Sequence, residues 1–224
     1  MEDSKSIRVT RLIAIPTVIT LAVTFLRLVG ELKHWPAPWF NTAAGGGGAI
    51  VGISWLPLIF GPIFAIKLVG AGNAPSSQGK VIGFSLVGLV VFVAGGALFA
   101  YSLQHPSPLT LVALILMLGS GLVPRHVWKT MGNVMIAYAF AARLPVLIVM
   151  YYAMRGNGGA GWGTHYDRVA PPLANLPFWT KFIEAAVLPQ MTVWIGWTVV
   201  LGMLFGSIVL ALARRGKQTA QASA

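Results

Sequence analysis

Long apolar runs alternate with short polar segments along most of the chain. A membrane-crossing helix needs ~20 mostly apolar residues, because each adds ~1.5 Å against a hydrocarbon core ~30 Å thick. Six runs meet or approach this length, over residues 12–29, 48–69, 81–103, 108–123, 131–153 and 187–213. The pattern predicts an all-α polytopic membrane protein, a single transmembrane domain of about six helices. The fourth run is short and bounded by Pro108 and Pro124, so it either thins the bilayer locally or is partly re-entrant.

The longest polar connection, residues 155–186, is predicted to form an outer loop. It begins with a glycine-rich stretch and then carries Phe178, Trp179, Phe182 and Ile183. Aromatic and aliphatic residues at this spacing are typical of a helix that lies in the membrane interface. We therefore expect a short interfacial helix before the last span.

The composition agrees with lipid as the surrounding medium. Of 224 residues, 56% are hydrophobic and 9% are charged, whereas soluble domains have about 45–50% and about 25%. The net charge of +11 comes from Lys and Arg residues dispersed over loops and helix ends. They form no continuous basic face, so nucleic acid is not expected as a partner.

The basic residues also indicate the orientation of the chain. With a cytoplasmic N-terminus, ten Lys and Arg residues lie inside, five lie outside and one, Arg143, lies in mid-membrane. The inside set is Lys5, Arg8, Arg11, Lys67, Lys80, Arg125, Lys129, Arg214, Arg215 and Lys217, and the outside set is Arg27, Lys33, Arg155, Arg168 and Lys181. The positive-inside rule then predicts that both termini are cytoplasmic. The expected location is a bacterial cytoplasmic membrane.

Residue types that carry membrane catalysis are scarce. The acidic residues are Glu2, Asp3, Glu31, Asp167 and Glu184, and none lies near the middle of a predicted span. This disfavours proton pumps, cation antiporters and intramembrane aspartyl proteases, which use carboxylates at membrane depth. Because the chain has no cysteine and no H-E-x-x-H motif, we expect neither a metal nor a cofactor. The scarcity of these residue types favours a protein that is not an enzyme.

Arg143 is the main candidate for a functional residue. It lies midway along the fifth predicted span, directly before Leu144 and Pro145. A charge at that depth costs about 2.5–3.5 kcal/mol on insertion scales, so something must offset it. Either Arg143 hydrogen-bonds carbonyls freed by Pro145 or Pro57, or it faces a hydrated cavity and holds an anionic solute, an anionic lipid headgroup or a partner's carboxylate. We expect it to point into the bundle, away from acyl chains.

The other candidate ligand-binding residues lie near the outer ends of spans. Arg27 and His34 lie at the end of the first span, and His165, Asp167 and Arg168 cluster in the last outer loop. Three functions remain open. The first is a small-solute or ion transporter or channel, and the second is a non-catalytic accessory or assembly subunit that binds a membrane-protein partner. The third is an enzyme at the outer interface that acts on a lipid.

Glycines supply positions for close packing. The pairs Gly48/Gly52, Gly79/Gly83 and Gly202/Gly206 are of the type that lets membrane helices approach closely, within one chain or in a homo-oligomer. The glycine run 45–48 is either a loose start of the second span or a nest of backbone N–H groups for an anion.

Overall fold

The computed structural model describes residues 8–46, 48–105 and 108–222, and for residues 214–222 it describes the backbone alone. The elements are α1 (Val9–Leu32), η1 (Ala44–Gly46), α2 (Pro57–Gly70), α3 (Gln78–Gln104), α4 (Leu109–Ser120), α5 (Leu122–Val127), α6 (Lys129–Arg155), η2 (Asn157–Gly159), η3 (Pro171–Leu173), α7 (Phe178–Phe182), η4 (Ile183–Val187), α8 (Leu188–Met191) and α9 (Val193–Ala222). No strand occurs among the residues described. The prediction of an all-α chain is confirmed.

Five helical segments of the described chain are long and apolar enough to cross a membrane. They are Val9–Leu32, Gln78–Gln104, Leu109–Val127, Lys129–Arg155 and Phe178–Ala213. Together they agree with an integral membrane protein. The number of segments that cross, and the membrane in which they lie, remain predictions.

The second predicted span differs most from the helix observed. α2 begins at Pro57, and residues 48–56 form turns and bends instead of helix. Pro57 occupies the first turn, where its missing N–H costs no hydrogen bond, and the glycines before it favour turns. The 14 residues of α2 measure about 21 Å, less than the ~30 Å of a hydrocarbon core. A sixth crossing therefore stays a prediction.

The fourth and last spans are both longer than the apolar runs. α4 and α5 together reach Val127 and make a segment of 19 residues. The last helix begins at Phe178, because α7 continues through one π-helical turn, η4, and α8 into α9. The aromatic segment predicted as an interfacial helix is thus helical. Its position in the interface remains a prediction.

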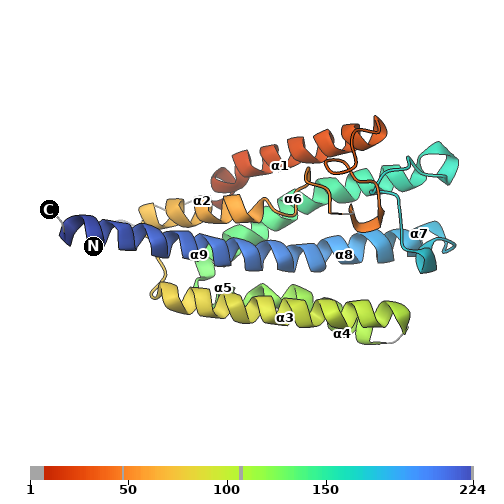
Figure 1. The fold of residues 1–224 in the computed structure, drawn as a ribbon. Coiled ribbons are helices and arrows are strands. Elements are labelled where there is room, and N and C mark those ends of the chain that lie inside the picture. Colours follow the sequence, from red (N-terminus) through yellow and green to blue (C-terminus); the bar gives the residue numbers. More distant parts are fainter. Residues whose placement is uncertain (1–7, 47, 106–107, 223–224) are drawn as a thin grey trace.

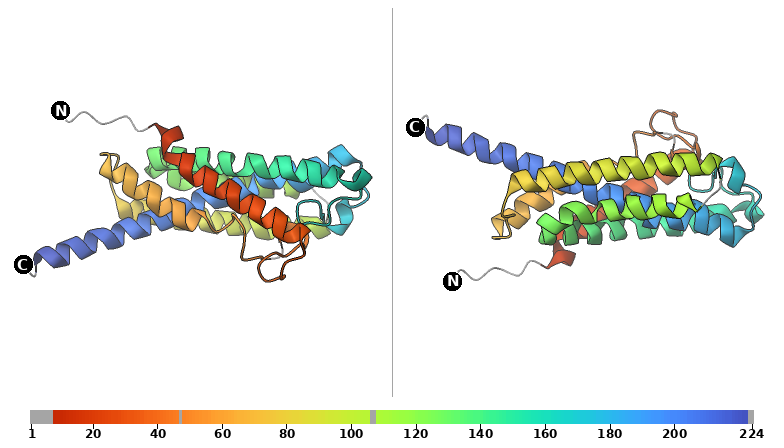
Figure 2. Two further views of the ribbon diagram at one scale, coloured as in Figure 1. Left: turned by 90° about the horizontal axis from the view of Figure 1, so that it is seen from above. Right: turned by 90° about the horizontal axis from the view of Figure 1, so that it is seen from below.

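α9 runs through the bundle and packs against α2, α3, α4 and α6 (Figures 1 and 2). At the contact with α2, a Cβ atom on Gly61 would collide with the backbone of Gly202, and one on Gly206 would lie 2.9 Å from the Gly61 carbonyl oxygen. Gly61 and Gly206 therefore permit the close approach of α2 and α9, whereas a Cβ atom on Gly202 would collide with Met135 of α6. By contrast, Gly79 and Gly83 have open space around them.

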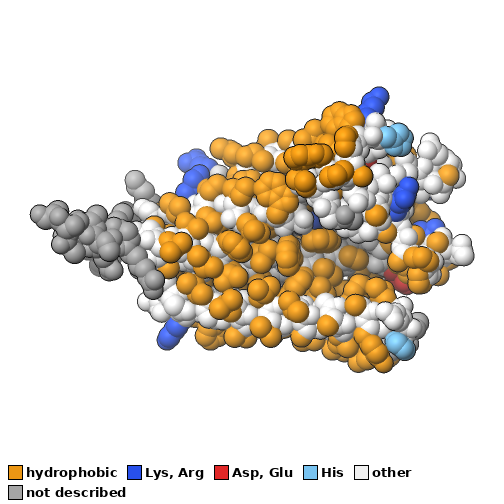
Figure 3. Space-filling model, in the orientation of Figure 1, with side chains coloured by type: hydrophobic (Ala, Val, Ile, Leu, Met, Phe, Trp, Pro, Cys, Tyr) orange, Lys and Arg blue, Asp and Glu red, His pale blue; other side chains and the backbone are white. Residues whose placement is uncertain are grey.

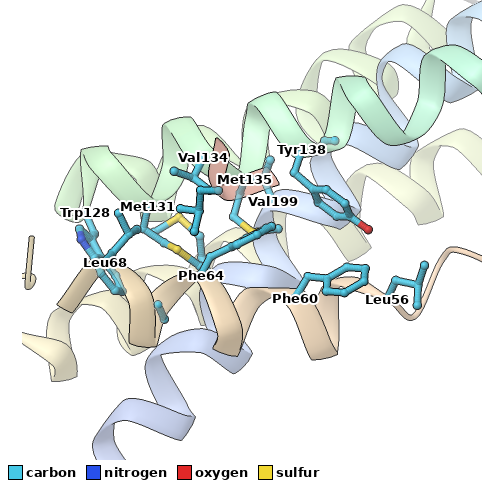
Figure 4. Close-up of a cluster of buried hydrophobic side chains, with 14 of the residues drawn as sticks. Leu56, Phe60, Phe64, Leu68, Trp128, Met131, Val134, Met135, Tyr138 and Val199 are labelled. Atoms are coloured by element: carbon cyan, nitrogen blue, oxygen red, sulfur yellow. The ribbon is translucent and has the colours of Figure 1, made fainter. Parts of the chain in front are cut away.

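Aromatic, aliphatic and methionine side chains fill the space between α2, α6 and α9 (Figure 4). Phe60 and Phe64 meet Tyr138 edge to face, with ring centroids 5.5 and 5.6 Å apart. Tyr138 is buried, and its hydroxyl oxygen lies 2.8 Å from Thr20 Oγ1 of α1. These contacts fix the register of α6 against α1 and α2. They thereby determine the position of Arg143, which follows Tyr138 on the same helix.

The flanks of the bundle are apolar, and the visible charged side chains lie mainly toward its two ends (Figure 3). Ile15, Val90, Leu111 and Ile148, on four different helices, are 59–69% exposed. A belt of this kind suits contact with acyl chains. The start of α1 and the end of α9 lie at one end of the bundle (Figures 1 and 2). We call the opposite end, with loops 33–56 and 156–177, the loop end.

The compartment that each end faces remains a prediction, since the positive-inside argument is the basis for it. One basic residue used in that argument, Lys5, lies outside the described residues. The side chains of Arg214, Arg215 and Lys217 do so as well.

Candidate functional site

A cavity of about 460 Å³ lies at the loop end of the bundle. Its walls come from α1, the segment 44–54, the end of α3, the middle of α6, the loop 165–173 and the helical turns from η4 to the start of α9. Arg168 and Glu184 line it and are exposed, whereas Arg143 lines it and is buried. The cavity therefore extends from the exposed loops to the middle of α6.

Among the described residues, no carboxylate lies within salt-bridge distance of the Arg143 guanidinium. Arg143 is 4% exposed, as expected for an arginine whose side chain points into the bundle. Nη1 lies 3.5 Å from Gln190 Oε1, at the long limit of a hydrogen bond. The guanidinium carbon lies 4.7 Å from the centre of the Trp194 ring, a cation–π contact. Nε is buried without a hydrogen-bond partner among the described residues.

The sequence suggests two ways in which the cost of burying the charge of Arg143 is offset. No hydrogen bond joins Arg143 to a carbonyl freed by Pro145 or Pro57 in the described part of the chain. In the same part of the chain no Asp or Glu oxygen lies within 4 Å of it. Arg143 lines a cavity, and its role as a ligand-binding residue stays a prediction.

Arg27, near the end of α1, has a carboxylate partner, in contrast to Arg143. Its Nε donates to Glu31 Oε1 at 2.8 Å, and its Nη2 donates to the carbonyl oxygens of Gly46 at 2.8 Å and Asn41 at 3.2 Å. The Glu31 side chain is fully buried one helical turn away. Arg27 and Glu31 thus form a neutral pair that also attaches the glycine segment to α1.

Gly46 permits this attachment for a steric reason. Its φ of +89° favours glycine, and a Cβ atom at this position would lie 2.9 Å from Arg27 Nη2, so the guanidinium would have to shift. The carbonyl of Gly46 faces the cation, while its N–H donates to the Ala43 carbonyl. Gly47, in the middle of the predicted anion nest, lies outside the described residues.

Glu31 also holds the last loop in place. Its Oε2 accepts from the backbone N–H of His165 at 2.8 Å, and its Oε1 lies 2.6 Å from His165 Nδ1. A carboxylate that accepts from a guanidinium and an amide has no proton to donate, so we assign the ring proton to Nδ1. Nε2 then carries a lone pair, and it makes no hydrogen bond within the described residues. His165 lines the cavity.

The buried surroundings of His165 favour the neutral form of its imidazole. Burial lowers the pKa of His165 below its ordinary value of 6.5, which the hydrogen bond to Glu31 counteracts in part and the charge of Arg27 reinforces. Since Arg27 and Glu31 cancel each other, the charge of Arg143 is the uncompensated one in the buried part of the cavity.

The residues that follow His165 order the loop. Tyr166 is buried, its hydroxyl donates to the Thr24 carbonyl at 3.2 Å, and burial raises its pKa, so that it stays protonated. Asp167 accepts from the backbone N–H groups of Gly163 and Thr164 at 3.0 and 2.8 Å, and from the Thr164 hydroxyl at 2.6 Å. The Asp167 carboxylate therefore stabilises its own turn.

Four of the six candidate ligand-binding residues line the cavity, namely Arg27, Arg143, His165 and Arg168. Asp167 does not line it, and its carboxylate is used by the turn before it. His34 is exposed and lies away from the cavity wall. Ligand binding by any of these residues remains a prediction.

Three residues of the site were not recognised in the sequence: Glu31, Gln190 and Trp194. Glu31 lies four residues after Arg27, a spacing at which oppositely charged side chains meet on a helix, and this signal could have identified the pair. Gln190 and Trp194 have the same spacing. Their contact with Arg143, however, depends on how α6 packs against α8 and α9, and no local pattern records it.

The chain matches no protein-family model, and no curated protein or solved structure is similar to it. The functional argument therefore rests on the geometry of the cavity.

Proposed function

We propose that the protein is a transporter or channel for a small anion, which it binds in the cavity beside Arg143. The observation that supports this is a guanidinium that is 4% exposed, lines a cavity, and leaves Nε unpartnered among the described residues. A cation buried without a counter-ion is costly at membrane depth. An anion in the cavity would offset that cost.

The surroundings of Arg143 favour an anion with two oxygen acceptors. The guanidinium carbon lies 4.7 Å from the centre of the Trp194 ring, a cation–π contact that uses none of the guanidinium N–H groups. Carboxylate, nitrate and sulfate oxygens match the N–H edge of a guanidinium as paired acceptors. The volume of about 460 Å³ lies within the range of about 300–1,000 Å³ typical of small-molecule sites.

Charged groups also line the path to Arg143. Arg168 and Glu184, of opposite charge, line the exposed part of the cavity, and Arg143 lines the buried part. Positive groups along a low-dielectric channel raise the local concentration of anions. Arg168 is accordingly proposed to attract the solute and Arg143 to bind it.

The two alternative functions have less support. An outer-interface enzyme would use His165 beside Asp167, yet His165 is bonded to Glu31, and Asp167 is bonded to Thr164. An accessory subunit would present Arg143 to a partner's carboxylate, yet this side chain lies inside the bundle and in a cavity lined by its own chain.

The proposal is tested by measuring nitrate, sulfate and acetate binding by calorimetry in detergent and their flux in proteoliposomes. We expect saturable binding of at least one of these anions to the wild type, weakened about tenfold or more in Arg143→Gln, because a bidentate charged contact is lost. Arg143→Lys should bind more weakly than the wild type, since a point charge does not reproduce the planar fork.

Arg155→Gln is the matched control. Arg155 lies on the same helix, is exposed and donates to Tyr151. Its replacement should leave both readouts unchanged. If the wild type bound none of the three anions, or bound them as well after Arg143→Gln, the proposal would be rejected.

A further inference from the structure

His165 lines the same cavity and carries a ring nitrogen that can accept a proton. Its Nδ1 is held by Glu31 at 2.6 Å and its backbone N–H by the same carboxylate at 2.8 Å, so the ring is fixed in one orientation. Nε2 is not hydrogen-bonded within the described residues, and His165 lines the same cavity as Arg143. A carboxylate behind an imidazole stabilises the imidazolium when it forms.

We infer that His165 is the proton acceptor of the anion site: an anion that enters beside Arg143 is accompanied by one proton, which binds to Nε2 of His165. This inference rests on the proposed function. The proton comes from bulk water, the bond formed is the Nε2–H bond, and no oxidation or reduction takes place. When anion and proton leave on the far side of the membrane, the two are transported together.

The charges around the His165 ring explain why its protonation requires an anion in the cavity. Glu31 and Asp167 favour the imidazolium, Arg27 opposes it, and burial opposes it most. Three further charged groups line the same cavity, namely Arg143 and Arg168, which oppose protonation, and Glu184, which favours it. The empty site therefore holds a neutral ring. An anion adds the negative charge that shifts this balance toward the imidazolium.

The strength of the coupling between anion binding and protonation of His165 follows from Coulomb's law. For unit charges about 10 Å apart at an effective dielectric constant near 20, the interaction changes a binding constant about tenfold. A divalent anion doubles the interaction energy, so its binding constant changes roughly a hundredfold. Nitrate should thus bind about tenfold more tightly when His165 is protonated, and sulfate about a hundredfold.

Nitrate and sulfate serve as the probes, because neither changes its charge between about pH 5 and pH 8. Calorimetry in two buffers of different ionisation enthalpy gives the number of protons taken up per anion bound. For the wild type we expect proton uptake of up to one per anion, with sulfate affinity more sensitive to pH than nitrate affinity.

His165→Asn is the principal variant, because its side-chain amide can still donate to Glu31 from the δ position while Nε2 is lost. It should bind the anions without proton uptake. His126→Asn, at an exposed position away from the loop end, is the matched control and should retain the coupling. Should His165→Asn not fold, nitrogen NMR of labelled histidine in the wild type replaces it, with protonation of Nε2 expected on adding sulfate.

The outcomes separate this inference from the proposed function. Anion binding by the wild type without proton uptake would overturn the role of His165 and leave the proposed function intact. Coupling that persists in His165→Asn and disappears in Glu184→Gln would assign the proton to Glu184 and likewise overturn the inference. If the wild type bound neither anion, the proposed function itself would fail.

Discussion

The two buried arginines should respond differently to the same substitution. Methionine is a suitable replacement for both, because it is unbranched and apolar and keeps most of the side-chain length. In Arg27→Met, the fully buried Glu31 carboxylate loses its ion pair, and two carbonyls lose a donor. Breaking a buried pair in this way costs about 3–5 kcal/mol of stability.

Arg143→Met should change stability far less. The arginine gains about 2 kcal/mol from a desolvated cation–π contact and about 1 kcal/mol from one long hydrogen bond. A charge at membrane depth costs about 2.5–3.5 kcal/mol, which opposes these two gains. The terms nearly cancel, so the free energy of unfolding should change by no more than about 1 kcal/mol, while anion binding is lost.

The assay is reversible unfolding in mixed micelles by titration with sodium dodecyl sulfate, followed by circular dichroism. This readout avoids tryptophan fluorescence, which the loss of the contact with Trp194 would alter. A loss of 3 kcal/mol or more in Arg143→Met, comparable to that in Arg27→Met, would refute the reasoning. It would show that Arg143 stabilises the bundle instead of binding a solute.

Three further predictions test the topology, the glycine segment and the loop. Reporter fusions at Ala224 and Asn157 should give cytoplasmic and external signals respectively, and the same location for both would contradict the orientation. Gly46→Ala should destabilise the protein more than Gly45→Ala in the same unfolding assay, because both have positive φ but only Gly46 faces Arg27. Equal effects would mean that the contact is unimportant. Without anions, the free energy of unfolding should fall as the pH is lowered below 6.5, because the unfolded chain protonates His165 at its ordinary pKa, whereas burial holds the folded-state pKa lower. The slope is at most about 1.4 kcal/mol per pH unit. His165→Asn should reduce it, and an unchanged slope would assign the effect to another group.

The sequence was sufficient to predict the class of fold, because membrane helices are specified by the length of their apolar runs. Helix ends were less predictable. Residues 48–56 are apolar enough to extend a span, but their glycines and the proline at 57 favour turns, so hydropathy and backbone preference disagree there. Phe178 and its neighbours are aromatic, which indicated an interfacial helix, yet they continue into the last helix.

The site was predictable only in its local parts. Arg143 stands out because a cation in an apolar run is costly wherever the chain folds. The partnership of Glu31 with His165 joins residues 134 positions apart and depends on the docking of a loop, for which the sequence has no periodic signal. Asp167 has a local role beside the predicted one, since a short acidic side chain commonly accepts from nearby backbone N–H groups.

The difference in charge compensation between Arg27 and Arg143 also explains how one bundle can hold two buried cations and remain stable in a lipid bilayer. Near the loop end, Arg27 is neutralised by Glu31, and the same carboxylate orders the loop that forms one wall of the cavity. Halfway along α6, Arg143 has an aromatic face and a weak amide contact but no counter-charge among the described residues. Assembly of the cavity thus depends on the compensated pair, and the affinity for anions that we propose depends on the uncompensated arginine. Because the first pair is internally neutral, it adds little to the field at depth, and the net charge that an entering solute meets there is set by Arg143 and by the protonation of His165.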